Sequence, residues 1–177
     1  MRTFLGVIFV GLSAALLNAG QAGNKAVEVK GPHICCKQCV NVVNSILKKV
    51  DGVSDVKADT KTKVVTFSAK DDKTAMAGFK ALVDGGFFGS ATEDGKEIKL
   101  APSAAKKGEK ANVVTVKDVH VCCGACQTAI KNIFSDSKVT FDGPTPQRTV
   151  RIEGKDLDRA DVLETLHKTG FNGSLEK

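Results

Sequence analysis

The chain has 177 residues, a formal net charge of +6 and no tryptophan or tyrosine, and its length can hold two small domains with modest cores. A basic balance would suit nucleic acid or a membrane surface. The lysines are scattered among acidic residues without a stripe of basic and aromatic side chains, so we expect no nucleic acid as a partner.

Residues 1–22 have the composition of a secretory signal peptide. Arg2 provides a positive charge, residues 4–17 form an uncharged and mostly apolar run, and Ala22 is one of several small residues at a cleavage site. The apolar run is shorter than the about 20 residues that a membrane span needs. We therefore expect a periplasmic or secreted protein, with no stable membrane insertion after cleavage. An uncleaved amino-terminal anchor is the alternative.

The first predicted domain covers residues 25–100 and begins with a strand followed by a helix. Val27 and Val29 alternate with charged residues, which is typical of a strand. Apolar residues then recur with helical spacing from about residue 36 to residue 50, and Gly52 follows as a stop signal. The remaining predicted elements are strands at 53–58 and 63–69, a helix at 74–84, and a last strand formed from 87–91 and 97–100 with a turn at Asp94 and Gly95.

Residues 101–111 contain no bulky apolar side chain, which predicts a linker to a second domain at residues 112–177. The sequence GFFGS at 86–90 is matched by GFNGS at 170–174, which indicates a duplication. The two units share a β-α-β-β-α-β order, so the predicted fold is α+β, with two tandem ferredoxin-like sandwich domains. The predicted elements of the second unit are strands at 112–117, 139–141, 149–152 and 173–176, and helices at 123–134 and 157–168.

One pattern, H-x-C-C-x-x-C, occurs twice and contains all six cysteines and two of the three histidines. It runs from His33 to Cys39 and again from His120 to Cys126, each time at the start of the first predicted helix of a domain. Clustered cysteines suit a ligand set better than a framework of disulfides between distant segments. The pattern therefore predicts a pair of soft-metal sites, one thiolate site per domain.

Cysteines three positions apart on the first turn of a helix point to the same side, so each C-x-x-C pair can bind one ion. The free amide groups and the dipole at a helix start stabilise thiolates. Soft thiolates select copper(I), zinc, cadmium or mercury. A helical pair alone suits a two-coordinate copper(I) or mercury site, whereas a Cys3His set suits tetrahedral zinc. The candidate ligands are Cys36, Cys39, Cys123, Cys126, Cys35, Cys122, His33 and His120.

Both units resemble the heavy-metal-associated domain, whose motif is G-M-x-C-x-x-C and which occurs in copper chaperones, periplasmic mercury-binding proteins and metal-exporting ATPases. The resemblance implies the β-α-β-β-α-β fold and metal binding by the two cysteines at the start of the first helix. Ile34 and Val121 replace the family's methionine. An extra cysteine before the first ligand shifts the expectation from linear copper toward zinc, cadmium or lead. Phe87 and Phe171 fall in the loop that approaches the metal in this family, although ordinary core aromatics are the alternative.

We expect a protein that is not an enzyme, namely an exported carrier of a soft metal ion. Zinc or copper(I) is the expected ion, at up to about two per chain, and a membrane metal transporter is a candidate partner. A thiol-disulfide oxidoreductase is one alternative, although no proline lies between Pro32 and Pro102 to face the first cysteines. A disulfide-stabilised interaction module is another, but three cysteines per unit would leave one unpaired unless the two units cross-link.

Overall fold

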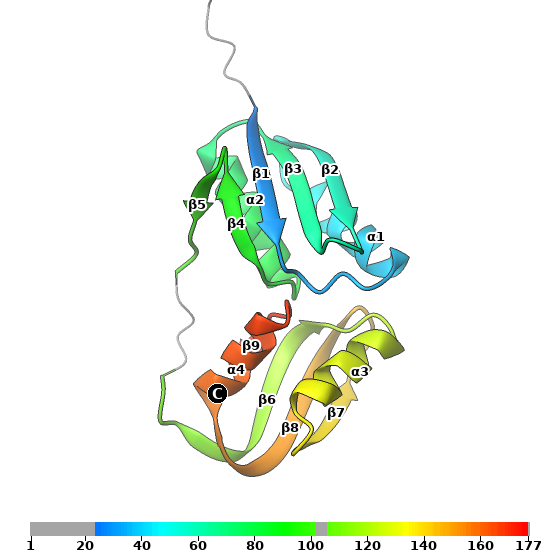
Figure 1. Cartoon of the computed structure of the whole chain (residues 1–177), viewed down its shortest axis with the longest axis vertical. Helices are drawn as coiled ribbons and strands as arrows, with labels where there is room; N and C mark the ends of the chain where they lie inside the picture. The colour runs from blue at the N-terminus through cyan, green and yellow to red at the C-terminus, as the bar shows by residue number, and fades with distance from the viewer. Residues whose placement is uncertain (1–23, 102–105, 177) are drawn as a thin grey trace, which may run out of the picture.

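A computed structural model of the chain describes residues 24–101 and 106–176, and the predicted signal peptide lies outside this part. Two units lie one above the other, each with a sheet and two helices (Figure 1). Within the described residues, no helix has the length and apolar character needed to cross a membrane.

The first unit is a sheet of five strands in the order β2-β3-β1-β4-β5, with every neighbouring pair antiparallel. Its core is formed where the apolar faces of α1 and α2 pack against the sheet, as the alternating burial of β1 and β3 requires. The elements are β1 (Lys25–Lys30), α1 (Lys37–Leu47), β2 (Val53–Asp59), β3 (Val64–Ala69), α2 (Asp72–Asp84), β4 (Ser90–Glu93) and β5 (Lys96–Ile98).

The second unit repeats this arrangement with four strands in the order β7-β8-β6-β9. The predicted fold class, two ferredoxin-like β-α-β-β-α-β sandwiches, is confirmed. The elements are β6 (Lys110–His120), α3 (Gly124–Ile133), β7 (Lys138–Asp142), β8 (Gln147–Asp158), α4 (Arg159–Lys168) and β9 (Ser174–Leu175).

Two elements differ from the sequence prediction. Strand β6 begins at Lys110, inside the predicted linker, and ends at His120, inside the cysteine motif, because it pairs along its length with a long β8. The predicted last strand of the first unit is two short strands, β4 and β5, which form a hairpin at the predicted turn of Asp94 and Gly95 with φ angles of 46° and 80°. The second motif therefore emerges directly from a strand.

Helices α1 and α3 begin at the cysteine motifs for the same local reasons. Cys36 and Cys123 are the N-cap residues, with extended φ angles of -153° and -154°, and neither side chain caps the helix. One turn further on, Cys39 and Cys126 point into the core on the buried face. Each motif thus places one thiol at the helix start and one beneath it, with the first amide groups free for a ligand.

The two units are held together by reciprocal backbone contacts. The His33 N–H donates to the Gly170 carbonyl at 3.0 Å, and the Asn172 N–H donates to the Gly86 carbonyl at 2.9 Å. Gly86 and Gly170 have φ angles of +88° and +85°, and a Cβ at either would collide with backbone of the other unit. Only glycine permits this close approach at both positions. The matched GFFGS and GFNGS segments therefore form the interface.

Candidate metal centre

All six cysteines meet at the interface between the two units. Each is free, and every sulfur lies within 4.0 Å of at least one sulfur from the other unit. The sequence predicts one thiolate site per domain, whereas the structure places both triplets in a single cluster. The reason is the glycine-mediated packing, which brings the starts of α1 and α3 together.

The sulfurs form two triangles, and each triangle combines a C-x-x-C pair with the preceding cysteine of the other unit. In the first triangle, Cys36 Sγ lies 3.7 Å from Cys39 Sγ and 3.7 Å from Cys122 Sγ, and Cys39 Sγ lies 3.4 Å from Cys122 Sγ. In the second, the distances are 3.8 Å between Cys123 and Cys126, 3.6 Å between Cys35 and Cys123, and 3.5 Å between Cys35 and Cys126.

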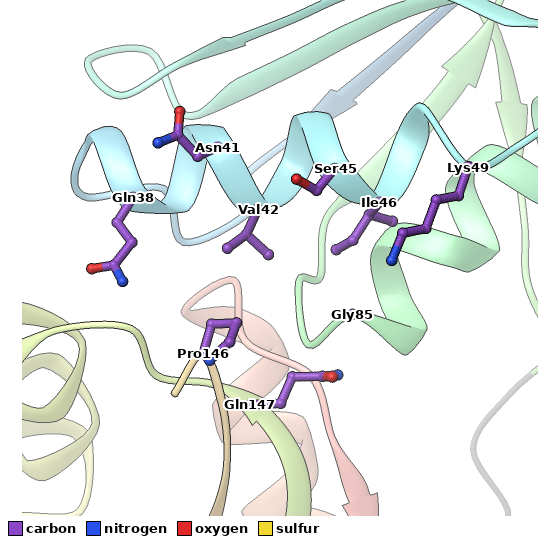
Figure 2. Close-up of a pocket in the computed structure, with 9 residues that line it drawn as sticks. All are labelled: Gln38, Asn41, Val42, Ser45, Ile46, Lys49, Gly85, Pro146 and Gln147. Carbon is purple, nitrogen blue, oxygen red and sulfur yellow. The ribbon is translucent and has the colours of Figure 1, made fainter. Parts of the chain in front are cut away.

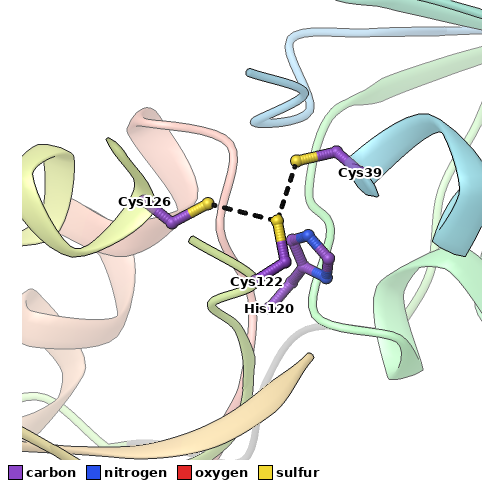
Figure 3. Close-up of side chains that lie close together, drawn as sticks. All are labelled: Cys39, His120, Cys122 and Cys126. Carbon is purple, nitrogen blue, oxygen red and sulfur yellow. Dashed lines mark hydrogen bonds between the residues drawn. The ribbon is translucent and has the colours of Figure 1, made fainter. Parts of the chain in front are cut away.

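The triangles touch one another, so the cluster is continuous. Cys35 Sγ lies 3.6 Å from Cys39 Sγ, and Cys122 Sγ lies 3.9 Å from Cys126 Sγ. Figure 3 shows Cys122 between Cys39 of the first unit and Cys126 of its own unit. Three of the cysteines are buried, namely Cys39 at 0%, Cys122 at 6% and Cys126 at 0% exposure. The other three are only half-buried, which leaves the cluster accessible from one side.

The thiols of the cluster differ in proton affinity. Hydrogen bonding with Cys126 lowers the pKa of Cys39, and the same interaction raises the pKa of Cys126. Burial raises the pKa of Cys35 to about 12. Burial also opposes ionisation of Cys123, but hydrogen bonds from backbone amides and the Cys35 thiol outweigh it and lower its pKa to about 7. Metal binding requires deprotonated cysteines, so the thiols with a lowered pKa are those that exchange a proton for a cation most readily.

Both motif histidines are covered by a phenylalanine of the opposite unit. The His33 ring stacks on Phe171 and the His120 ring stacks on Phe87, each with 4.2 Å between ring centroids. His120 is 0% exposed, and neither of its ring nitrogens has a hydrogen-bond partner among the described residues. A buried ring nitrogen without a hydrogen-bond partner lowers the stability of the fold unless a ligand binds to it.

Each histidine also lies beside sulfurs of the other unit. One nitrogen of His120 and the sulfurs of Cys39, Cys122 and Cys126 all lie within 4.8 Å of one another. His33 lies in the same way beside Cys35 and Cys126. The structure therefore brings together all eight residues that the sequence nominated.

Aromatic side chains of both units pack against one another at the interface. Phe87 and Phe171 are fully buried and cover the histidines, so they are core residues that also enclose the cluster. The His167 ring stacks on Phe88 of the first unit with 3.8 Å between ring centroids, because the end of α4 packs against that unit. The Asn172 Oδ1 accepts a hydrogen bond from His167 Nε2 at 2.7 Å. In the sequence, only the matched GFFGS and GFNGS segments pointed to the residues that form this interface.

A groove of about 360 Å³ lies beside the interface, between α1 and the start of β8 (Figure 2). The Gln147 side-chain amide closes its floor by donating to the Asp84 carbonyl at 3.1 Å. The lining contains no cysteine, histidine or carboxylate, so the groove offers no further soft-metal ligands. Its lining residues are Gln38, Asn41, Val42, Ser45, Ile46, Lys49, Gly85, Pro146 and Gln147.

Comparison with known proteins finds a likeness for the first unit. The model of the heavy-metal-associated domain matches residues 32–85, which include the first motif. The first unit is therefore similar to the heavy-metal-associated domain over these residues, and the cysteine cluster contains groups that could hold a metal ion. Among solved structures, the chain is similar to the N-terminal soluble domains of Bacillus subtilis CopA in solution, at 17% identity and a TM-score of 0.31, covering 86% of this chain and 94% of that chain. No curated protein sequence matches.

Proposed function

We propose that the protein is an exported carrier or buffer of a soft metal ion, with copper(I) or zinc as its cargo. The observation that supports this most strongly is the convergence of six free thiols at one interface. Thiolate sulfur selects copper(I) and zinc over hard cations such as magnesium and calcium. Helix starts at Cys36 and Cys123 direct free amide groups toward the sulfurs, which offsets part of the negative charge of the thiolates.

The spacing of the sulfurs indicates the coordination number. With metal–sulfur bonds of about 2.3 Å, a linear site separates its sulfurs by about 4.6 Å, a trigonal site by about 4.0 Å and a tetrahedral site by about 3.8 Å. The separations within the two triangles are 3.4 to 3.8 Å. Three or four ligands therefore fit better than two. Copper(I) would take three thiolates, and zinc would add a histidine nitrogen such as that of His120.

Carriage requires that an ion can leave as well as enter. Cys36 and Cys123 stand at the accessible side of the cluster and are half-buried, while Cys39 and Cys126 lie beneath them. A thiol of a partner can attack the ion from this side and replace one ligand at a time. A membrane metal transporter with its own cysteine pair is the partner we expect.

The reduced state of the cluster is part of the proposal. The shortest sulfur–sulfur distance is 3.4 Å, whereas a disulfide bond is about 2.05 Å long. A module held together by disulfides would need pairs at bonding distance, and an oxidoreductase would need one reactive pair set apart from the rest. The shared cluster favours neither alternative.

Anaerobic native mass spectrometry of the reduced protein, titrated separately with copper(I) and zinc, tests the proposal. We expect at least one ion per chain, retained against a chelator that competes at nanomolar free metal, and no binding by a variant with all six cysteines replaced by serine. Affinity weaker than about micromolar for both ions would contradict the proposed function.

Export is tested independently of metal binding. The full-length chain expressed in a bacterium should reach the periplasm or medium, and its intact mass should show cleavage after Ala22. Retention in the cytoplasm with residues 1–22 still attached would contradict the export part of the proposal.

A further inference from the structure

We propose that the two domains exchange metal ligands, so that each C-x-x-C pair binds its ion together with the H-x-C segment of the other domain. This inference rests on the proposed function of soft-metal binding and specifies how the site is built. It gives the two halves of H-x-C-C-x-x-C separate tasks. The first half serves the ion of the opposite domain, and the second half serves the domain's own ion.

The position of Cys122 carries the inference for the first site. Its sulfur lies 3.4 Å from Cys39 of the other domain and 3.9 Å from Cys126 of its own. It also lies 3.7 Å from Cys36, which completes a triangle with sides close to those of a trigonal thiolate site. Cys122 is therefore placed to ligate the ion held by α1.

The second site repeats the exchange with the domains reversed. Cys35 Sγ lies 3.5 Å from Cys126 Sγ and 3.6 Å from Cys123 Sγ, both at the start of α3. Its separation from Cys39 of its own domain is similar, 3.6 Å, so the exchange is more complete at the first site than at the second. Reciprocity at both sites follows from the packing of Gly86 and Gly170 against backbone of the opposite unit.

The histidines follow the same exchange. His120 is fully buried, and its ring nitrogens have no hydrogen-bond partner among the described residues. It lies inside one possible ligand group with Cys39 of the first unit and with Cys122 and Cys126 of its own. His33 lies with Cys126 of the second unit in another. Each ring is fixed by a phenylalanine of the domain whose ion it faces, Phe87 for His120 and Phe171 for His33. A nitrogen is thus available to each site when the ion requires a fourth ligand.

A consequence is that metal binding and domain docking are coupled. An ion bound by ligands of both domains holds them together, and undocking removes at least one ligand from each ion. By linkage, the ion stabilises the docked state by the same factor by which docking strengthens binding. Undocking therefore weakens the hold on each ion and assists its stepwise transfer to the thiols of a partner.

Two triple variants with the same number of cysteines test the exchange. C36S/C39S/C122S removes the first cross-domain triangle and leaves Cys35, Cys123 and Cys126. C35S/C36S/C39S removes the first motif's triplet and leaves the cysteines of the second motif. The two variants share the changes at positions 36 and 39 and differ only in which third cysteine is lost, so any damage to α1 is matched.

Anaerobic copper(I) titration with a chelator and X-ray absorption of the loaded protein supply the readouts. We expect C36S/C39S/C122S to bind one ion at least about tenfold more tightly than C35S/C36S/C39S, with about three sulfur ligands against about two. Equal or tighter binding by C35S/C36S/C39S would overturn the exchange, while copper(I) binding by the wild type would leave the proposed function intact. Failure of the wild type itself to bind would overturn both.

Discussion

The two domains carry the same motif but hold it differently. In the second domain β6 continues to His120, which pairs with Gln147 of β8, whereas in the first domain β1 ends at Lys30 and His33 lies in a loop. His120 and Cys122 are consequently buried, while His33 and Cys35 are half-buried. Under ligand exchange, the more rigid H-x-C segment completes the site of the first domain. We therefore expect that site to be the tighter one.

The largest effect is expected from variants that separate the domains without touching a thiol. In G86A/G170A, each new Cβ would collide with backbone of the opposite unit, so docking should be lost and copper(I) affinity should fall at least about tenfold. The matched control is G95A/G143A, where φ angles of +80° and +87° impose the same backbone strain but no atom lies within 4 Å. Solution scattering reports docking, and chelator competition reports affinity.

Both glycine variants should keep their secondary structure by circular dichroism. If G86A/G170A bound copper(I) as the control does, while scattering showed separated domains, each domain would be building its own site.

The aromatic cover of the histidines should contribute strongly to stability. Phe87 is 1% exposed and packs on His120, so F87A should lower the free energy of unfolding by about 3 to 5 kcal/mol. Met76 lies in α2 and is 36% exposed, and M76A should change stability by only about 0.5 kcal/mol. Urea unfolding of the metal-free protein measures both. A small loss in F87A would show that the interface around His120 is loosely packed.

Single substitutions of the exchanged cysteines should reveal the difference between the sites. C122S removes a 6%-exposed ligand from the site of the first domain and should weaken the tighter binding event by about tenfold. C35S removes a half-buried ligand and should weaken only the second binding event, by a smaller factor. Stepwise copper(I) titration separates the two events. Equal losses of copper(I) affinity in both variants would show that the H-x-C segment at the end of β6 and the one in the loop after β1 contribute equally to binding.

The smallest predicted effect is a pH dependence of the metal-free protein. Burial raises the pKa of the Cys35 thiol to about 12 from its ordinary value of 9.0. Between these two pKa values the folded state keeps the Cys35 proton that the unfolded state releases. The contribution of the Cys35 thiol to the free energy of unfolding is therefore fully present below about pH 9 and is lost as the pH rises toward about 12. The urea midpoint should therefore fall more between about pH 8 and about pH 10.5 in wild type than in C35S. An equal fall of the urea midpoint in wild type and C35S would contradict the raised pKa of Cys35.

Local features of the fold could be predicted because they follow from short-range pattern. The alternation of Val27 and Val29, and the helical spacing after each C-x-x-C pair, fixed the element order of both units. The extent of β6 could not be predicted in this way. Asp118 has a φ of +61° and the pairing register shifts between Val116 and Val119, so the alternation breaks while the strand continues.

The joining of both cysteine triplets in one cluster could not be predicted from local sequence pattern either, for a different reason. The sequence places three cysteines at the start of each first helix, but the distance between Cys39 and Cys122 depends on how two folded units pack. The matched glycines at 86 and 170 were visible as a repeat, yet their role emerges only when the opposite backbone is in place. The extra cysteine and histidine were predicted as ligands of their own domain, whereas the proposed exchange assigns them to the ion of the other domain.

A thiol cross-link map of the reduced, metal-free chain tests the central claim most directly. A short bifunctional thiol reagent, applied at dilution so that reaction stays within one chain, would be followed by digestion and peptide sequencing by mass spectrometry. We expect links that join residues 33–39 to residues 120–126, with a prominent link between Cys39 and Cys122, whose sulfurs are 3.4 Å apart. Links confined to cysteines within the same motif would contradict a shared centre.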